Sequence, residues 1–287
     1  MSALDHKIDF SVLLVVNKAN PNGDPLNGNR PRQNYEGFGE ISDVAIKRKI
    51  RNRLQDAGET IFVQSDDRKN DNYKSLRERA DGNIDLKEAD KKKDEANFVQ
   101  IACGTWLDVR AFGQVFAFKG NGAGKGVSVG IRGPVTVQEA TSIDPIDIAT
   151  MQITKSVNSE TSEKRGSDTM GMKHRVDFGF YRFNGSINVQ LAEKTGFSND
   201  DAEKIKEALV SLFENDASSA RPEGSMEVYK VYWWSHKSKL GQYSAAKVHH
   251  SLVVNKKATV DIPRKIGDYD ITLAHLDGLE CEILDGR

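Results

Sequence analysis

The thirteen residues Asn20-Pro-Asn-Gly-Asp-Pro-Leu-Asn-Gly-Asn-Arg-Pro-Arg32 are the starting point for interpreting this sequence. They include three prolines, two glycines and four asparagines. This composition opposes regular structure, because proline fixes φ and lacks a donor N–H, and Asn-Gly pairs favour positive φ. The segment follows an apolar run at residues 10–16, which predicts a buried strand. We therefore predict a specified loop between a core strand and the basic helix that follows, and we expect it to hold a ligand.

The basic helix is predicted over residues 43–57, with Ser42 as its N-cap and Gly58 at its end. Its apolar face consists of Ile46, Ile50, Leu54 and Ala57. Its five bases are Lys47, Arg48, Lys49, Arg51 and Arg53. A solvated helix surface usually mixes charges of both signs, but no acid lies between residues 44 and 55. We therefore predict that these bases contact phosphate groups.

Length and composition suit one domain with large solvated insertions. The chain has 287 residues, of which 38% are hydrophobic and 29% charged. No apolar run reaches the length of a membrane span, and residues 1–7 lack the apolar core of a signal peptide. Cys103 and Cys281 lie far apart and in no metal-binding spacing. We expect a cytoplasmic protein without a metal or cofactor.

The net charge is only −1, but the charges are segregated along the sequence. Residues 230–265 hold eight bases and one acid, whereas residues 192–223 hold eight acids and four bases. Separate basic and acidic faces suit a protein that binds a polyanion, and they also suit head-to-tail packing of copies. Ordinary surface scatter is the alternative for any single run.

Two insertions interrupt the core pattern. Residues 66–97 form a charged, partly helical insertion without evident chemistry. Residues 143–175 predict a protruding hairpin with an apolar base and a basic tip, although a disordered polar loop is the commoner explanation for such a segment. The methionines and basic residues of this hairpin suit contact with unstacked bases and phosphates. They are Met151, Lys155, Lys164, Arg165, Met170, Met172, Lys173, His174 and Arg175.

The remaining segments predict a mixed α and β core. Strands are expected at residues 60–64, 127–139, 175–183, 186–191 and 226–235, with a turn or bend at Asn184-Gly185. Residues 98–118 predict a helical stripe of Leu107, Ala111, Phe112, Val115 and Phe116, with Asp108 and Arg110 facing outward. Residues 119–126 form a glycine-rich loop that lacks the spacing of a phosphate-binding loop. A second helix is expected at residues 200–214, capped by Ser198 or Asn199, and residues 252–254 and 258–262 predict a hairpin.

Without its insertions the chain reads strand, helix, strands, helix, strand. This order is the ferredoxin-like βαββαβ plan of the α+β class. Phe178-Gly-Phe-Tyr-Arg-Phe183 partly matches the base-stacking strand of RNA-recognition domains, although a core strand is the more common explanation.

Three motifs resemble one known family. They are Asn20-Pro-Asn-Gly-Asp-Pro25, Asp108-Val-Arg-Ala-Phe-Gly113, and Met170-Gly-Met-Lys-His-Arg175 leading into Phe178-Gly-Phe-Tyr181. In this order they resemble the type I-C CRISPR-associated backbone subunit, the repeated RNA-binding protein of Cascade. The resemblance implies a modified RNA-recognition palm with a thumb hairpin and a helical insertion. It also implies that copies line up head to tail along one CRISPR RNA (crRNA), which pairs with target DNA in antiviral defence.

The resemblance also implies partners and residue roles. The partners would be the large subunit, the crRNA-processing subunit and a recruited helicase-nuclease, and Met170 or Met172 would be the thumb's apolar wedge. A guide carrier needs backbone contacts that carry no sequence information, because its spacers differ. The candidate RNA-binding residues are Asn20, Asn22, Gly23, Arg30, Arg32, Lys47, Arg48, Lys49, Arg51, Arg53, Lys164, Arg165, Met170, Met172, Lys173, His174 and Arg175.

The alternative is a metal-dependent endoribonuclease of the type III backbone kind, with Asp24 as its catalytic acid. However, an aspartate in Asn-Gly-Asp-Pro is more often a turn residue, and no second acid, histidine or lysine lies within the loop. We therefore expect a binding protein with no catalytic residue rather than an enzyme. A solitary RNA-binding protein with a sequence preference is a third possibility.

Overall fold

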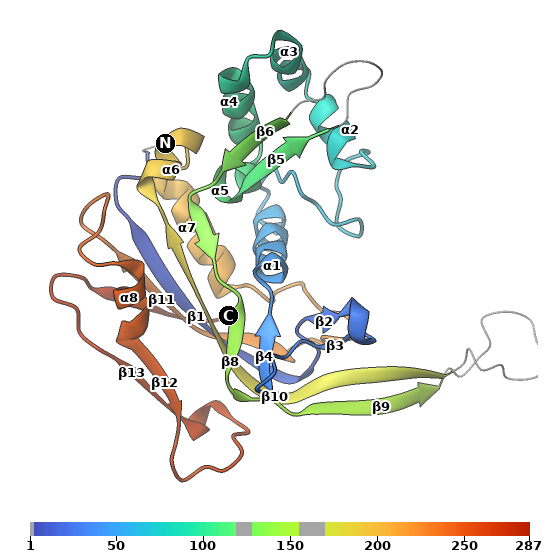
Figure 1. The fold of residues 1–287 in the computed structure, drawn as a ribbon, viewed down its shortest axis with the longest axis vertical. Coiled ribbons are helices and arrows are strands. Elements are labelled where there is room, and N and C mark those ends of the chain that lie inside the picture. Colours follow the sequence, from blue (N-terminus) through green and yellow to red (C-terminus); the bar gives the residue numbers. More distant parts are fainter. Residues whose placement is uncertain (1–2, 119–127, 155–169) are drawn as a thin grey trace, which may run out of the picture.

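The computed structural model describes residues 3–118, 128–154 and 170–287 (Figure 1). Its centre is an antiparallel sheet in the order β14-β11-β1-β10-β8-β4. The strands of this path are β1 (Ile8–Ala19), β4 (Phe38–Ile41), β8 (Ala140–Pro145), β10 (Met170–Ile187), β11 (Met226–Ser235) and β14 (Cys281–Asp285). The predicted strand at residues 10–16 is the middle of β1, which is longer at both ends.

The sheet follows the predicted βαββαβ plan. In chain order the plan is β1, helix α1 (Asp43–Asp56), β8, β10, helix α7 (Asn199–Val210) and β11. β1 lies between β10 and β11, and β10 lies between β1 and β8, with all pairings antiparallel. The α+β prediction is therefore confirmed.

Both faces of the sheet are buried, because side chains alternate along each strand. On one face Val12 and Leu14 of β1 belong to the same core cluster as Ile50 of α1 and Leu209 of α7. On the other face Leu13 and Val15 pack in a second cluster with α8 (Ala245–Ser251) and the pair β12 (Leu252–Lys256) and β13 (Tyr269–Leu273). The sheet is thus a central layer, with helices α1 and α7 on one side and the α8–β12–β13 arm on the other.

Helix α1 begins and ends close to where its caps predict. The Ser42 hydroxyl accepts a hydrogen bond from the N–H of Ala45, and Gly58 follows the helix at a φ of 88°. The predicted apolar face is buried except for Ala57, which is exposed. Helix α7 is likewise capped by Ser198, whose hydroxyl bonds the N–H of Asp201 in a capping box.

A separate module carries its own apolar core, at the top of Figure 1. It consists of α2 (Leu76–Asp81), α3 (Ile84–Lys92), α4 (Glu95–Thr105), α5 (Leu107–Phe112) and the pair β5 (Gly113–Ala117) and β6 (Ser128–Arg132). Val115 and Phe116 therefore lie in a strand, where a helical stripe was predicted. The strand predicted at residues 127–139 is split into β6 and β7 (Val135–Val137), with Gly133-Pro134 between them. Residues 119–126, the glycine-rich loop, lie outside the described residues.

The strand predicted at residues 60–64 is not formed, and the reason is Asp108. Its carboxylate accepts hydrogen bonds from the N–H groups of Phe62 and Val63, at 2.7 and 3.0 Å. A side chain thus satisfies donors that a strand would present to a neighbour. Asp108 is 1% exposed, so the prediction that it faces outward is wrong. Arg110 is also turned inward and forms an ion pair of 2.9 Å with Asp201.

The protruding hairpin predicted at residues 143–175 is present as a two-stranded ribbon. β9 (Ile148–Thr154) pairs with residues 170–176 of β10, and the ribbon extends away from the body of the protein (Figure 1). Lys155, Lys164 and Arg165 lie outside the described residues.

Three other predictions are wrong. Asn184-Gly185 does not turn, because β10 continues through it, and the Phe10 ring occupies the space that a Cβ at Gly185 would fill. β10 ends at Ile187 and helix α6 (Val189–Thr195) follows, where a strand was predicted. β12 pairs with β13 rather than with residues 258–262.

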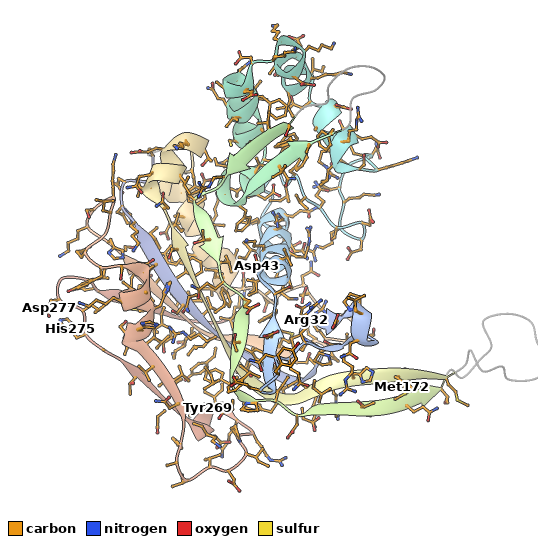
Figure 2. The ribbon with its side chains drawn as sticks, viewed as in Figure 1. Arg32, Asp43, Met172, Tyr269, His275 and Asp277 are labelled. Atoms are coloured by element: carbon orange, nitrogen blue, oxygen red, sulfur yellow. The ribbon has the colours of Figure 1, made fainter. Side chains whose placement is uncertain are left out.

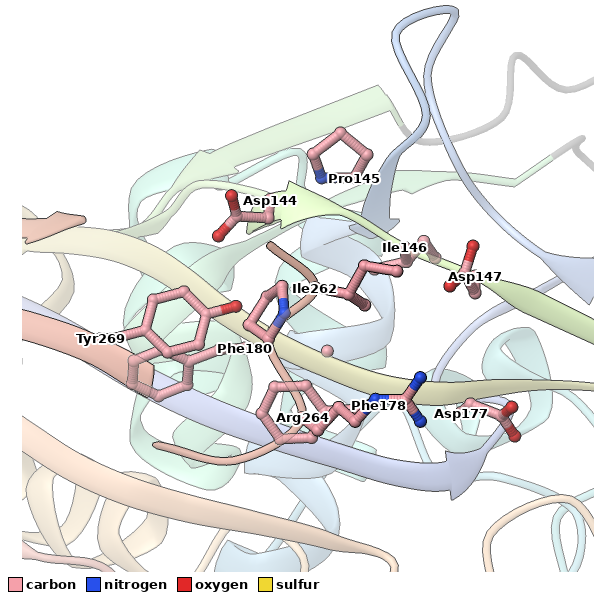
Figure 3. A pocket seen from close by; sticks show the side chains of 12 residues that line it. Asp144, Pro145, Ile146, Asp147, Asp177, Phe178, Phe180, Ile262, Arg264 and Tyr269 are labelled. Atoms are coloured by element: carbon pink, nitrogen blue, oxygen red, sulfur yellow. The ribbon is translucent and has the colours of Figure 1, made fainter. Parts of the chain in front are cut away.

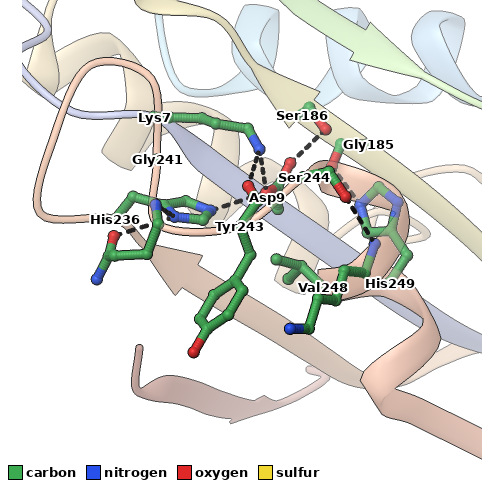
Figure 4. A network of polar contacts seen from close by, with 12 residues as sticks. Lys7, Asp9, Gly185, Ser186, His236, Gly241, Tyr243, Ser244, Val248 and His249 are labelled. Atoms are coloured by element: carbon green, nitrogen blue, oxygen red, sulfur yellow. Dashed lines mark hydrogen bonds and ion pairs between the residues drawn. The ribbon is translucent and has the colours of Figure 1, made fainter. Parts of the chain in front are cut away.

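A buried polar network ties the start of β1 to the segment after β11 (Figure 4). Asp9 is fully buried and accepts hydrogen bonds from His236 Nε2 at 2.8 Å and Ser186 Oγ at 2.5 Å. Lys7 Nζ forms an ion pair with the same carboxylate at 2.8 Å. Burial raises the pKa of Asp9, but the hydrogen bonds from His236, Lys7 and Ser186 outweigh it and hold this pKa below its ordinary value. The network therefore fixes Asp9 as a carboxylate inside the fold.

Candidate nucleic-acid interface

The segment at residues 20–32 is a small, tightly bonded hairpin. β2 (Gly23–Asp24) pairs with β3 (Arg30–Pro31) around a 3-10 turn, η1 (Pro25–Asn27). Each strand is only two residues long. The prediction of a loop without regular structure is therefore wrong at the strand pair and at the 3-10 turn.

The asparagines and Gly23 hold the shape of this hairpin. Asn20 is buried and its amide donates to the Asn29 carbonyl at 2.6 Å. The Asn22 side-chain oxygen accepts from the N–H of Ser42, at the start of α1. A Cβ at Gly23 would lie 1.9 Å from Asn29 Oδ1, so any other residue there would displace the Asn29 side chain. These contacts give Asn20, Asn22 and Gly23 a structural role, and RNA contact by them stays a prediction.

Most of the bases of α1 are neutralised within the chain, which the sequence pattern did not indicate. Lys47 pairs with Asp43 at 2.9 Å, Arg53 pairs with Asp56 at 2.7 Å, and Lys49 forms a short ion pair with Asp216. Lys49 is only 6% exposed, and burial lowers its pKa even though Asp216 favours its charged form.

Arg51 is also committed to a carboxylate. Its Nε donates to Asp108 Oδ2 at 2.9 Å, and its guanidinium lies over the Phe112 ring. The sequence pattern did not show that acids distant in sequence reach this helix, and phosphate contact by its bases stays a prediction.

Arg48 is the exception on this helix. Its Nη1 donates to the Val63 carbonyl at 2.6 Å, and no ion pair joins it to a carboxylate among the described residues. Burial and the adjacent charge of Arg51 lower its pKa. A half-buried guanidinium without an acid partner is a favourable place for an anion.

Arg48 lines a hollow of about 570 Å³. Its walls come from four segments: the hairpin at residues 21–23, α1, residues 65–68 and residues 215–221. Lys49, Arg68 and Arg221 add positive charge to the lining, and Asp67 and Asp216 add negative charge. Lys49 and Arg221 share the Asp216 carboxylate, whereas Arg68 pairs with Asp56. The hollow is cationic overall. Arg48 is the cation of its lining that forms no ion pair with a described carboxylate, although the charges of Asp108 and Asp67 act on it from a distance.

Sequence reasoning missed Arg68 and Arg221. Arg68 lies in the polar insertion that we interpreted as lacking chemistry, and Arg221 lies in an acidic stretch of sequence. No local signal indicates either residue, because only the fold brings residues 65–68 and 215–221 to α1.

The ribbon presents its candidate residues on two opposite faces. Residues that pair across strands share a face, so Met170, Met172 and His174 lie with Thr150 on one side. Lys173 and Arg175 lie on the other side, where Arg175 also pairs with Asp177 at 3.3 Å. Met170 and Met172 are 60% and 57% exposed, which is high for large apolar side chains.

One contact joins the hairpin to the ribbon. Arg30 Nη1 donates to Thr150 Oγ1 at 3.0 Å, and this hydroxyl lies 2.9 Å from His174 Nδ1. The methionine face of the ribbon is therefore the face turned towards the hairpin. Figure 2 shows Arg32 on the hairpin side and Met172 farther out along the ribbon. The hairpin thus contacts the ribbon through Arg30, and its residues 21–23 line the hollow beside α1.

Asp24 has a structural role in the hairpin. Its carboxylate accepts a hydrogen bond from the N–H of Leu26 at 3.1 Å and lies 3.6 Å from Arg32 Nη2. Among the described residues, no group of three or more histidine, cysteine, aspartate or glutamate side chains is placed to hold a metal.

A second hollow lies at the base of the ribbon and has the opposite charge (Figure 3). Asp144, Asp147 and Asp177 line it together with Arg264 and the buried ring of Tyr269. Its volume is about 90 Å³. This hollow is therefore less suited to phosphate than the hollow beside α1.

The fold and this surface define the class: an α+β protein on the ferredoxin-like plan, with an inserted ribbon beside a cationic hollow. The model of the family described as "CRISPR-associated protein Cas7" matches residues 6–274. The chain therefore belongs to the Cas7 family. No helix in the described part of the chain is both long and apolar enough to cross a membrane.

The chain is also similar to individual proteins. The "CRISPR-associated protein Cas7" of Haloferax volcanii is 26% identical over 228 residues, which are 74% of this chain and 66% of that relative. The match thus spans just under two thirds of the relative's length. A chain of a "CRISPR RNA-guided surveillance complex, pre-nicking" has a TM-score of 0.55 and 13% identity, over 89% of this chain and 84% of its own. Its similarity supports the fold. A chain of another "CRISPR RNA-guided surveillance complex" has a TM-score of 0.43 and 16% identity, over 79% and 68% of the two chains.

Proposed function

We propose that this chain is the crRNA-binding backbone subunit of a type I-C Cascade surveillance complex. The observation that supports it best is Arg48, a cation without an acid partner in a hollow bounded by the hairpin and α1. A phosphate group there would receive hydrogen bonds from a guanidinium that forms no ion pair with a described carboxylate. Backbone contact of this kind is independent of base sequence, as a carrier of variable guides requires.

The proposed assembly is a row of copies, head to tail along one crRNA, that acts in the cytoplasm. Its other partners would be the large subunit, the crRNA-processing subunit, a recruited helicase-nuclease, and target DNA through the guide. Internal ion pairs reduce the charge contrast between faces, since Lys230 pairs with Asp285 and Lys239 with Glu193. We therefore base the head-to-tail proposal on family membership more than on charge.

The ribbon would act as the thumb that bends the RNA. Its exposed Met172 and Met170 lie on the face turned towards the hairpin, beside His174 and Arg30. Apolar side chains next to cations suit contact with an unstacked base while phosphates are held nearby.

Native mass spectrometry of the chain co-expressed with a CRISPR array tests the assembly. Several copies on one repeat-flanked RNA are expected, whereas one copy per RNA would contradict the proposal. Arg48→Gln should reduce the RNA that co-purifies. Lys87→Gln, at an exposed lysine of α3, is the matched control and should retain it.

We further propose that the subunit does not cut RNA. The support is Asp24, whose carboxylate is engaged by Leu26 and Arg32 in the turn. The assembled complex is incubated with magnesium and complementary RNA, and intact RNA is expected. Regularly spaced cuts that disappear in Asp24→Ala would instead establish the endoribonuclease alternative.

A further inference from the structure

Leu26 is the most unusual side chain of the hairpin. It lies in the η1 turn at the apex and is 97% exposed. Full burial of a leucine side chain is worth about 1.5–3 kcal/mol, and none of this is gained in the isolated chain. Leu26 is therefore not there for the stability of the fold.

The turn that presents Leu26 is held from several sides. Asp24 Oδ1 accepts from the N–H of Leu26, and the Asp24 carbonyl accepts from the N–H of Asn29 at 2.8 Å. Gly28 and Asn29 have positive φ values of 57° and 59°, which close the turn. The Asn20 amide bonds the Asn29 carbonyl from the end of β1. These bonds fix the backbone on which the exposed side chain is mounted, so little entropy would be lost if Leu26 entered a partner.

The surroundings of Leu26 indicate the kind of partner. The hairpin carries Arg30 and Arg32, and its residues 21–23 form one wall of the hollow that contains Arg48. Leu26 is the only large apolar side chain of residues 20–32 that is exposed. A stable protein interface buries about 800 Å² on each partner, far more than one leucine supplies. A single exposed apolar side chain is instead the kind of group that proteins insert between the bases of a stack.

We propose that Leu26 is an apolar wedge that inserts between two adjacent bases of the strand bound in the Arg48 hollow. This inference rests on the proposed function, because it requires a nucleic acid there. Leu26 belongs to the hairpin and Met172 to the ribbon, so the two side chains would contact the strand at different steps. The hairpin is then a second element, besides the ribbon, that fixes where the bound strand loses its stacking.

Fluorescence of 2-aminopurine in a synthetic guide RNA tests the wedge. This base analogue brightens when it loses a stacked neighbour, and it is placed at successive positions of RNA bound to the purified chain. We expect bright positions in the wild-type complex and a severalfold loss of signal at one of them in Leu26→Ala. RNA affinity should change by no more than about threefold, because phosphate contacts supply most of it. Leu240→Ala, at a leucine 79% exposed after β11, is the control and should keep every bright position.

Two results would overturn the inference. The first is a complete set of bright positions in Leu26→Ala. The second is fewer copies per RNA with all positions still bright, which would make Leu26 a contact between subunits. Leu26→Gln, which keeps side-chain length but adds polarity, should reproduce the loss. Failure of the wild-type chain to bind RNA would refute the proposed function itself, and is distinguished because fluorescence is measured only in complexes that contain RNA.

Discussion

Arg48 and Arg51 lie one turn apart on α1, yet the structure predicts opposite consequences for their replacement by glutamine. Arg51 donates to Asp108, which is 1% exposed, so Arg51→Gln leaves a buried carboxylate without its cation. Breaking a buried pair in this way costs about 3–5 kcal/mol of unfolding free energy. Arg48 makes one hydrogen bond to a carbonyl, and its loss costs about 0.5–1.5 kcal/mol.

For RNA affinity the order is reversed, and Arg48→Gln is the variant with the larger effect. A hydrogen bond from a charged group contributes about 1.5–3 kcal/mol, so Arg48→Gln should weaken RNA binding about 10- to 150-fold. It should also reduce the salt slope by about 0.7 for one lost phosphate contact on a single strand. Arg51→Gln should leave both the affinity of the folded fraction and its salt slope close to those of the wild type.

Two measurements separate these effects. Urea unfolding followed by tryptophan fluorescence gives the stability of each variant, and fluorescence anisotropy of labelled RNA over a series of salt concentrations gives affinity and slope. An unchanged salt slope in Arg48→Gln would refute the assignment of the hollow to phosphate. Equal losses of RNA affinity in both variants, at unchanged stability, would refute the division of α1 into a structural and a binding arginine.

Two further predictions concern stability. Burial raises the pKa of Asp201, but its hydrogen bonds with Arg110 outweigh this effect and lower the pKa below 3.8. The carboxylate therefore stabilises the fold above that pH, and the stabilisation is lost as the pH falls through the lowered pKa. Urea titrations should therefore show that Asp201→Asn loses less unfolding free energy than the wild type below about pH 4. An equal loss in the two proteins would contradict this. Gly185→Ala places a Cβ 2.1 Å from Phe10 Cζ and should lower the unfolding free energy by about 1–3 kcal/mol through overpacking. Gly171→Ala on the ribbon meets only ordinary contacts and should leave the stability nearly unchanged. Equal urea midpoints for the two variants would contradict the packing around Gly185.

Much of the fold is predictable because its signals are local. The cap at Ser42, the apolar spacing of α1 and the continuous apolar run of β1 each act over a few residues. Together they gave the βαββαβ order. The ribbon was predictable for the same reason, from the apolar base and the basic polar tip of residues 143–175.

The errors come from contacts between residues far apart in sequence. Asp108 lies 57 residues from Arg51 and 46 residues from Phe62. Its carboxylate nevertheless forms an ion pair with Arg51, and it accepts the hydrogen bond that the Phe62 N–H would otherwise donate to a neighbouring strand. A Gly after Asn usually marks a turn, but Gly185 serves to admit the ring of Phe10, which is distant in the chain. The cationic hollow likewise joins four separate segments, so a count of charges along α1 overestimated how many of them are free.

Strand β10 has a consequence for how proteins of this design can change. Its residues from Val176 onward pair with β1 in the core, and residues before Val176 pair with β9 in the ribbon. The described ribbon therefore reaches about 20 Å past the sheet, at ~3.3 Å per residue. Because side chains alternate with a period of two, insertion or deletion of two residues in each strand preserves which side faces the hairpin. The reach of the ribbon can thus drift during evolution, or be engineered, while the core that carries it stays the same.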